Sequence, residues 1–108
     1  MSASLHREAL EALGDANRRA IVEILSGGGR SVQEIADRLP ISRPAVSRHL
    51  RLLKHAGLAA DVAEGTRRVY HLREEGVEAV QEYFAEMWGE AARRFRILAE
   101  NTQLAQGE

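Results

Sequence analysis

The segment from Ser42 to His55 (SRPAVSRHLRLLKH) constrains the fold more than any other part of this chain. Wound as a helix of about 3.6 residues per turn, it separates into two faces. Val46, Leu50 and Leu53 lie on an apolar face, and four Lys and Arg residues lie on the opposite one. No Asp or Glu occurs among the fourteen residues. The pattern predicts a helix that packs on a folded support and presents positive charge outward.

A second predicted helix precedes this segment and ends at a short turn. Ser31 and Glu34 match the S-x-x-E capping box that opens a helix. We expect Pro40 to end it, because a proline ring clashes with the preceding turn. Ser42 then caps the basic helix, and Gly57 closes it as a left-handed residue. The two helices and their three-residue turn have helix-turn-helix spacing. The apolar residues of the earlier helix share one face: Val32, Ile35, Ala36 and Leu39.

Three further helices are expected from apolar periodicity. Two precede the pair, over residues 4–13 and 16–25, and Asp15 is a good N-cap for the second. The third begins near residue 74 and continues for more than twenty residues, with an interrupted apolar stripe and many glutamates.

Residues 58–62 and 67–72 are rich in strand-forming residues, with a glycine-containing turn at 63–66. They predict a β-hairpin with Arg67 and Arg68 near its tip. The expected fold is therefore mainly α with a β-hairpin. It is a winged helix-turn-helix of about five helices plus a two-stranded wing, and one domain accounts for residues 1–108.

Charge is unevenly distributed along the 108 residues, although the net charge is only −1. Residues 1–41 carry −1, residues 42–73 carry +5 and residues 74–108 carry −5. The field at a surface depends on where charge lies rather than on its total. The middle third is therefore the expected anion-binding part, and its partner is predicted to be double-stranded DNA.

Several classes of function have no support in the sequence. The absence of cysteine excludes disulfides, thiolate metal sites and a thiol nucleophile. Gly27, Gly28 and Gly29 lack the Gly-Lys-Ser/Thr sequence of a phosphate-binding loop, and no Ser-His-acid set has a recognisable spacing. No enzyme activity and no cofactor are expected. Neither a membrane span nor a signal peptide is visible, so we expect a cytoplasmic protein without a membrane partner.

Three stretches together resemble the ArsR/SmtB family of prokaryotic transcriptional repressors, and they cover about half of the chain. They are ALGDANRRAIVEIL at 12–25, SVQEIADRLPISRPAVSRHLRLLKHAGL at 31–58 and EGTRRVYHL at 64–72. The resemblance implies a homodimer that places its two recognition helices in successive major grooves. The expected function is a sequence-specific DNA-binding transcriptional regulator that acts as a dimeric repressor on a palindromic operator.

The helix 42–55 and the wing 63–68 are the expected DNA-binding elements. Arg pairs well with guanine edges, and hydroxyl, amide and backbone N–H groups bind phosphate. The candidate residues in the helix are Ser42, Arg43, Ser47, Arg48, His49 and Arg51. Those outside it are Gln33, Thr66, Arg67 and Arg68. His49 projects into the apolar face, so a buried, hydrogen-bonded structural role stays an alternative for it.

The terminal helices, over about 4–13 and 75–100, are predicted to form the dimer interface. Large apolar side chains on the last helix are more than one small domain can cover. The candidate interface residues are Leu5, Leu13, Phe84, Met87, Trp88, Ala91, Phe95 and Leu98. Completion of the protomer's own core is the alternative for them.

Metal sensing, which is common in the resembled family, does not fit this sequence. There is no cysteine, no histidine follows His71, and the four histidines lack the spacing of ligand pairs. No metal site is therefore expected. An unidentified small-molecule effector stays open. So does a second function class, a winged-helix module that binds a protein and has no specific DNA binding.

Overall fold

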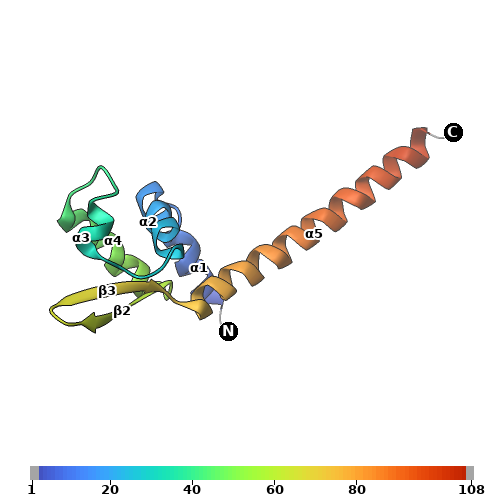
Figure 1. The fold of residues 1–108 in the computed structure, drawn as a ribbon. Coiled ribbons are helices and arrows are strands. Elements are labelled where there is room, and N and C mark those ends of the chain that lie inside the picture. Colours follow the sequence, from blue (N-terminus) through green and yellow to red (C-terminus); the bar gives the residue numbers. More distant parts are fainter. Residues whose placement is uncertain (1–2, 107–108) are drawn as a thin grey trace.

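The computed structural model describes the backbone of residues 3–106 and the side chains of residues 7–102. Helices account for most of this part of the chain (Figure 1), and a small sheet lies beside them. In chain order the elements are α1 (Ala3–Ala12), α2 (Ala16–Ser26), β1 (Arg30–Ser31), α3 (Val32–Ala36), α4 (Arg43–His55), β2 (Ala59–Glu64), β3 (Arg67–Leu72) and α5 (Glu74–Gln106).

The predicted helix caps are confirmed. The Asp15 carboxylate accepts hydrogen bonds from the backbone N–H groups of Asn17 and Arg18, at 2.8 and 3.1 Å. The Ser42 hydroxyl accepts one from the N–H of Ala45, at 3.2 Å. Gly57 follows α4 with a φ of 80°, the left-handed conformation expected of it. Local side-chain chemistry thus fixes where α2 and α4 begin and where α4 ends.

Helix α3 is shorter than the sequence predicts. It ends at Ala36, before Pro40 is reached, because the next residues tighten into turns. Arg38 N–H donates to the carbonyl of Ile35 at 3.0 Å, a three-residue step rather than the four-residue step of an α-helix. The connection to α4 is correspondingly longer than the three residues expected.

The predicted hairpin wing is confirmed as β2 and β3, and a short strand that the sequence did not predict, β1, extends the sheet to three strands. The strand order is β1-β3-β2 and both pairings are antiparallel. In β1, Arg30 opposes Tyr70 and Ser31 opposes Val69. Two residues are too few to produce an alternating pattern, which explains why this strand is not predicted from the sequence. The hairpin turn is also tighter than the expected 63–66, because Glu64 pairs with Arg67 and only Gly65 and Thr66 form the turn.

The core lies where α2, α3 and α4 meet. Its five largest fully buried side chains are Ile21, Ile35, Val46, Leu50 and Leu53, each with 0% of its surface exposed. Three of these five form the predicted apolar face of α4. Burying an aliphatic side chain of this size stabilises a fold by about 1.5–3 kcal/mol. The opposite, cationic face of α4 is therefore mounted on a rigid support.

Helix α5 packs on the body only through its first turns. Gly76 lies against Gly57 so closely that a Cβ at position 76 would be 2.1 Å from the Gly57 carbonyl oxygen. Ala79 is buried next to this contact. The rest of α5 projects away from the other elements (Figure 1). The radius of gyration, 19.2 Å, exceeds the roughly 13 Å of a compact chain of this length.

None of the helices described has the length and apolar character needed to cross a membrane.

Candidate nucleic-acid interface

The outward face of α4 presents two arginines with no partner. Arg48 and Arg51 are exposed, and neither forms an ion pair or hydrogen bond with any side chain that the structure describes. Ser47 lies half-buried on the same helix. Guanidinium groups in this state keep all five N–H donors for an external acceptor. Two of the predicted contact residues are therefore free to bind a ligand.

Arg43, at the first position of α4, contacts α3. Its Nη1 donates to Oε1 of Gln33 at 3.3 Å, and Nε2 of Gln33 donates to Oδ1 of Asp37 at 2.7 Å. All three side chains are exposed. This chain of contacts links the starts of the two helices, and it places two predicted contact residues, Gln33 and Arg43, side by side.

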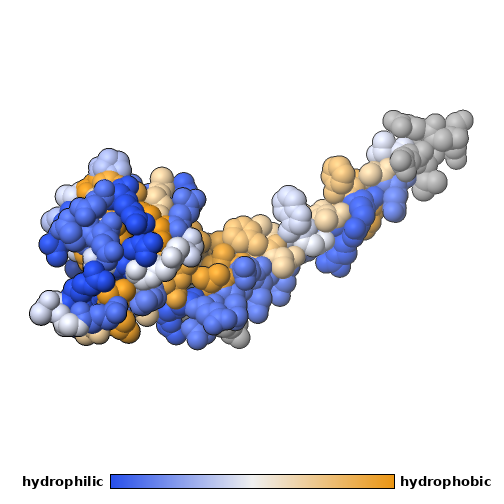
Figure 2. Space-filling model, viewed as in Figure 1, coloured by the Kyte–Doolittle hydropathy of each residue, from blue (hydrophilic) through white to orange (hydrophobic). Residues whose placement is uncertain are grey.

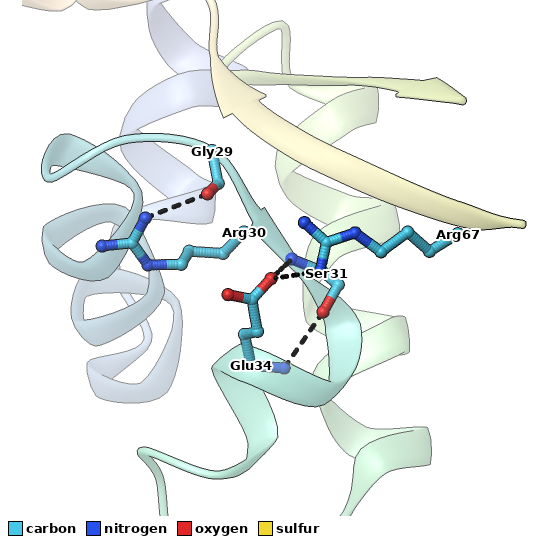
Figure 3. A network of polar contacts seen from close by, with 5 residues as sticks. All are labelled: Gly29, Arg30, Ser31, Glu34 and Arg67. Atoms are coloured by element: carbon cyan, nitrogen blue, oxygen red, sulfur yellow. Dashed lines mark hydrogen bonds and ion pairs between the residues drawn. The ribbon is translucent and has the colours of Figure 1, made fainter. Parts of the chain in front are cut away.

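The wing is tied to α3 through Glu34. Its Oε1 accepts from Nη1 of Arg67 at 3.1 Å and from the backbone N–H of Ser31 at 3.0 Å. The Ser31 hydroxyl in turn accepts from the N–H of Glu34 at 3.2 Å, which completes the predicted capping box (Figure 3). The backbone and hydroxyl of Ser31, and then the charge of Arg67, hold the pKa of Glu34 below its ordinary value.

A second carboxylate, Asp61 of β2, joins the wing to α4. Its Oδ1 lies 2.6 Å from Nζ of Lys54, and its Oδ2 lies 3.0 Å from Nη1 of Arg68. The Asp61 side chain is only 6% exposed, whereas those of Lys54 and Arg68 are 55% and 64% exposed. The hydrogen bond from Lys54, with the charges of both cations, holds the pKa of Asp61 below its ordinary value.

His49 lies half-buried behind this surface, on the side of α4 that faces α2. Its Nδ1 is 3.4 Å from Nη1 of Arg18, whose Nε donates to the carbonyl of Ala12 at 2.6 Å. A guanidinium can only donate, so Nδ1 of His49 is the acceptor. This geometry favours the structural role for His49 over direct contact with a ligand. The contact with Arg18 uses Nδ1 of His49 and does not involve Nε2.

Several predicted contact residues line one hollow between α3 and the wing. Its volume is about 550 Å³. Of the predicted set, its walls include Gln33, Arg43, Thr66, Arg67 and Arg68. On the face shown in Figure 2, hydrophilic residues predominate over the helical body and the wing tip is pale, in contrast to the apolar patches along α5. The structure thus brings the predicted cations to one side of the protein.

The acids that organise this surface are not evident from the sequence pattern. Asp61 enters only the net charge of residues 42–73, and Glu34 is predicted only as part of a helix cap. The register of β2 on β3 places Asp61 opposite Tyr70, two residues from Arg68 and on the same face. A signal for the pairing with Arg68 was therefore present in the hairpin pattern. The contact with Lys54 depends on tertiary packing and had no such signal.

The outer part of α5 carries exposed apolar side chains. Trp88 is 74% exposed, Phe95 72% and Leu98 65%, and Phe84 and Met87 are nearly half exposed. Ala91 lies on the same side and is also exposed. The other two predicted interface residues differ from these six. Leu13 packs against the core of its own protomer, and the Leu5 side chain lies outside the described residues.

Within residues 7–102, no group of three or more His, Asp or Glu side chains is arranged to hold a metal ion.

Comparison with known proteins identifies the family. Residues 13–62 match a helix-turn-helix domain family. Over 83 residues the chain is 49% identical to the HTH-type transcriptional regulator Rv2034 of Mycobacterium tuberculosis, an alignment that covers 77% of this chain and 78% of that protein.

Solved structures extend the similarity to the whole fold. An ArsR-like transcriptional regulator from Rhodococcus sp. RHA1 superimposes with a TM-score of 0.76 at 26% identity, over 90% of this chain and 92% of that one. A homodimeric winged helix-turn-helix DNA-binding domain from Mycobacterium bovis, a possible ArsR-family regulator, gives 0.64 at 28% identity, over 85% and 82%. The chain belongs to the ArsR/SmtB family of winged helix-turn-helix transcriptional regulators.

Proposed function

We propose that this protein is a homodimeric repressor that binds a palindromic DNA operator through α4 and the wing. The observation that carries the proposal is the pair of exposed guanidinium groups of Arg48 and Arg51, which have no partner among the described side chains, on a helix whose opposite face buries Val46, Leu50 and Leu53. A rigid helix with free Arg side chains can read guanine N7 and O6 in the major groove. Arginines on a mobile backbone segment could not hold that register.

The dimensions of α4 suit this role. Its thirteen residues span about 20 Å, and a major groove about 12 Å wide admits one α-helix. In this arrangement Arg43 lies at the start of the recognition helix, and Gln33 of α3 lies beside it. The backbone of the DNA would pass over both residues. Arg67 and Arg68 on the wing would contact the flanking phosphates or the adjacent minor groove. The wing cations thus position the protein, and α4 supplies sequence preference.

The apolar face of α5 supports dimerisation. It comprises Phe84, Met87, Trp88, Ala91, Phe95 and Leu98. Leaving this face in water is unfavourable, and pairing with its copy across a two-fold axis would cover it. The homodimeric M. bovis domain offers a related precedent. Two recognition helices related by a two-fold axis would meet half-sites about one helical turn, roughly 34 Å, apart.

Binding to two labelled duplexes tests the proposal. One duplex is selected by the protein from a random-sequence library, and the other has the same composition in shuffled order. We expect a preference for the selected duplex and, for about four phosphates neutralised per protomer, a slope of log K against log salt near −7. Arg48→Ala and Arg51→Ala should reduce the preference, whereas Arg93→Ala on distant α5 should preserve it. Equal binding of both duplexes by the wild-type protein would refute specific recognition and favour a protein-binding module.

A further inference from the structure

We propose that Asp61 is a positioning residue for DNA recognition, which sets the wing against α4 and restrains two cations that would otherwise bind any phosphate. This inference rests on the proposed DNA-binding function. Asp61 itself would not touch DNA, because its side chain is almost completely covered. It acts through Lys54 and Arg68, one from each of the two elements that it joins.

The outer part of the wing has little else to hold it. Strand β1 pairs with β3 only at Val69 and Tyr70, so Arg67 and Arg68 lie beyond the three-stranded region. Two carboxylates anchor this outer part: Glu34 holds Arg67 from α3, and Asp61 holds Arg68 from β2. Among the ion pairs of the described residues, only those of Asp61 connect the wing to the recognition helix, through Lys54 in its last turn. The end of α4 also packs on the start of β2, and Asp61 adds a polar link farther out along the wing.

Asp61 also limits the charge available to DNA. Lys54 and Arg68 are more than half exposed, yet both are directed onto one nearly buried anion. Without that anion, two mobile cations would face the phosphates, and their binding would be the same for every sequence. With it, each cation is held against Asp61 and is less free to follow the backbone of an arbitrary duplex. The Asp61 carboxylate thus lowers the affinity of the protein for DNA of any sequence and raises the ratio of its affinities for the operator and for other sequences.

Asp61→Asn tests this with a matched control. The substitution keeps the size of the side chain and removes its charge. Glu64→Gln removes the same charge from the same strand, but Glu64 is exposed and forms no ion pair with any side chain that the structure describes. Both variants are titrated with the selected and shuffled duplexes at several salt concentrations. Circular dichroism establishes that each is folded.

For Asp61→Asn we expect the shuffled duplex to bind more tightly and the ratio of the two affinities to fall about tenfold. We also expect the salt slope to steepen by about 2 per dimer, as one more phosphate contact forms in each protomer. Glu64→Gln should raise both affinities equally, leaving ratio and slope unchanged. If Asp61→Asn has the same ratio of affinities for the two duplexes as Glu64→Gln, the inference is overturned. The loss of one negative charge would then explain the whole effect of the substitution.

Lys54→Gln keeps the test decisive if Asp61→Asn does not fold. It breaks the contact from the α4 side, at an exposed position in the last turn of the helix. We expect the affinity ratio to fall again. Equal weakening of both duplexes would instead assign Lys54 to phosphate binding alone and overturn the positioning role. If the wild-type protein shows no preference between the two duplexes, the proposed function is refuted. If the wild-type protein has a preference and the variant retains it, only the positioning role of Asp61 is refuted.

Discussion

Replacement of Trp88 by alanine should dissociate the dimer. In the protomer 74% of the Trp88 surface is exposed. Covering that fraction of an aromatic side chain removes roughly 150 Å² from water, worth about 4 kcal/mol at about 25 cal/mol per Å². Each dimer contains two copies, but burial is rarely complete and α5 readjusts. We therefore expect a loss of about 4 kcal/mol per dimer, which raises the dimer Kd about a thousandfold.

Sedimentation velocity over a range of concentrations measures this Kd directly. Glu86→Ala is the control, because Glu86 is exposed on the opposite side of the same helix turn and should leave the Kd unchanged. Because Trp88 is exposed in the protomer, the variant should keep the helix content of the wild type by circular dichroism. It should also lose affinity for a palindromic duplex, since each half-site is then bound singly. A Trp88→Ala protein with the dimer Kd of the wild type would refute the reasoning.

Three further predictions concern stability. Gly76→Ala should lower the free energy of unfolding by about 1–3 kcal/mol, because the added Cβ meets the Gly57 carbonyl oxygen. Thermal denaturation measures this change, and an unchanged Tm would contradict the close contact. Leu50→Ala should cost about 2–5 kcal/mol in urea denaturation, since the side chain is fully buried, and a cost near zero would contradict the placement of the core. Folding lowers the pKa of the Asp61 carboxyl, so its contribution to stability is present above the ordinary pKa of 3.8 and is lost as pH falls through the lower pKa of the folded state. Between pH 5 and 3, the free energy of unfolding of Asp61→Asn should therefore fall less steeply than that of the wild type. Parallel curves for the two proteins would contradict the ion pairs.

The elements that local sequence chemistry controls could be predicted. Asp15, Ser31 and Ser42 each place a side-chain oxygen two or three residues before a backbone N–H that it accepts from, and Glu34 accepts in return from the N–H of Ser31. A short window of sequence therefore contains each whole interaction. The apolar face of α4 is likewise visible in its helical period. These features account for most of the helix-turn-helix and for the orientation of its cationic face.

The features that the sequence did not reveal depend on contacts between distant residues. Strand β1 exists because Arg30 and Ser31 meet β3, about forty residues later. Gly29 passes so close to β3 that a Cβ there would be 2.3 Å from the His71 ring, a constraint that no local pattern shows. The contact between Asp61 and Lys54 likewise needs the end of α4 to lie over β2. Such contacts are set by packing and not by propensity.

Two acids also change the electrostatic picture that the charge distribution suggested. The sequence predicts positive charge directed outward, and the structure pairs Lys54, Arg67 and Arg68 each with a carboxylate. On α4, the guanidinium groups of Arg48 and Arg51 have no partner among the side chains described. The exposed pair of Arg67 with Glu34 contributes only about 0–1 kcal/mol, so a phosphate can compete for Arg67, whereas Lys54 and Arg68 pair with a nearly buried carboxylate. The charge pattern therefore located the surface but not its organisation.

Dimethyl sulfate protection of guanine N7 on the selected duplex tests the role of α4 most directly, because N7 is reached only through the major groove. The wild-type protein should protect guanines in two patches, centred about 10 base pairs apart on one face of the duplex. Arg48→Ala should remove the protection of individual guanines in both patches while the flanking phosphate contacts persist. Full occupancy of the duplex without any protected major-groove guanine would contradict recognition through α4.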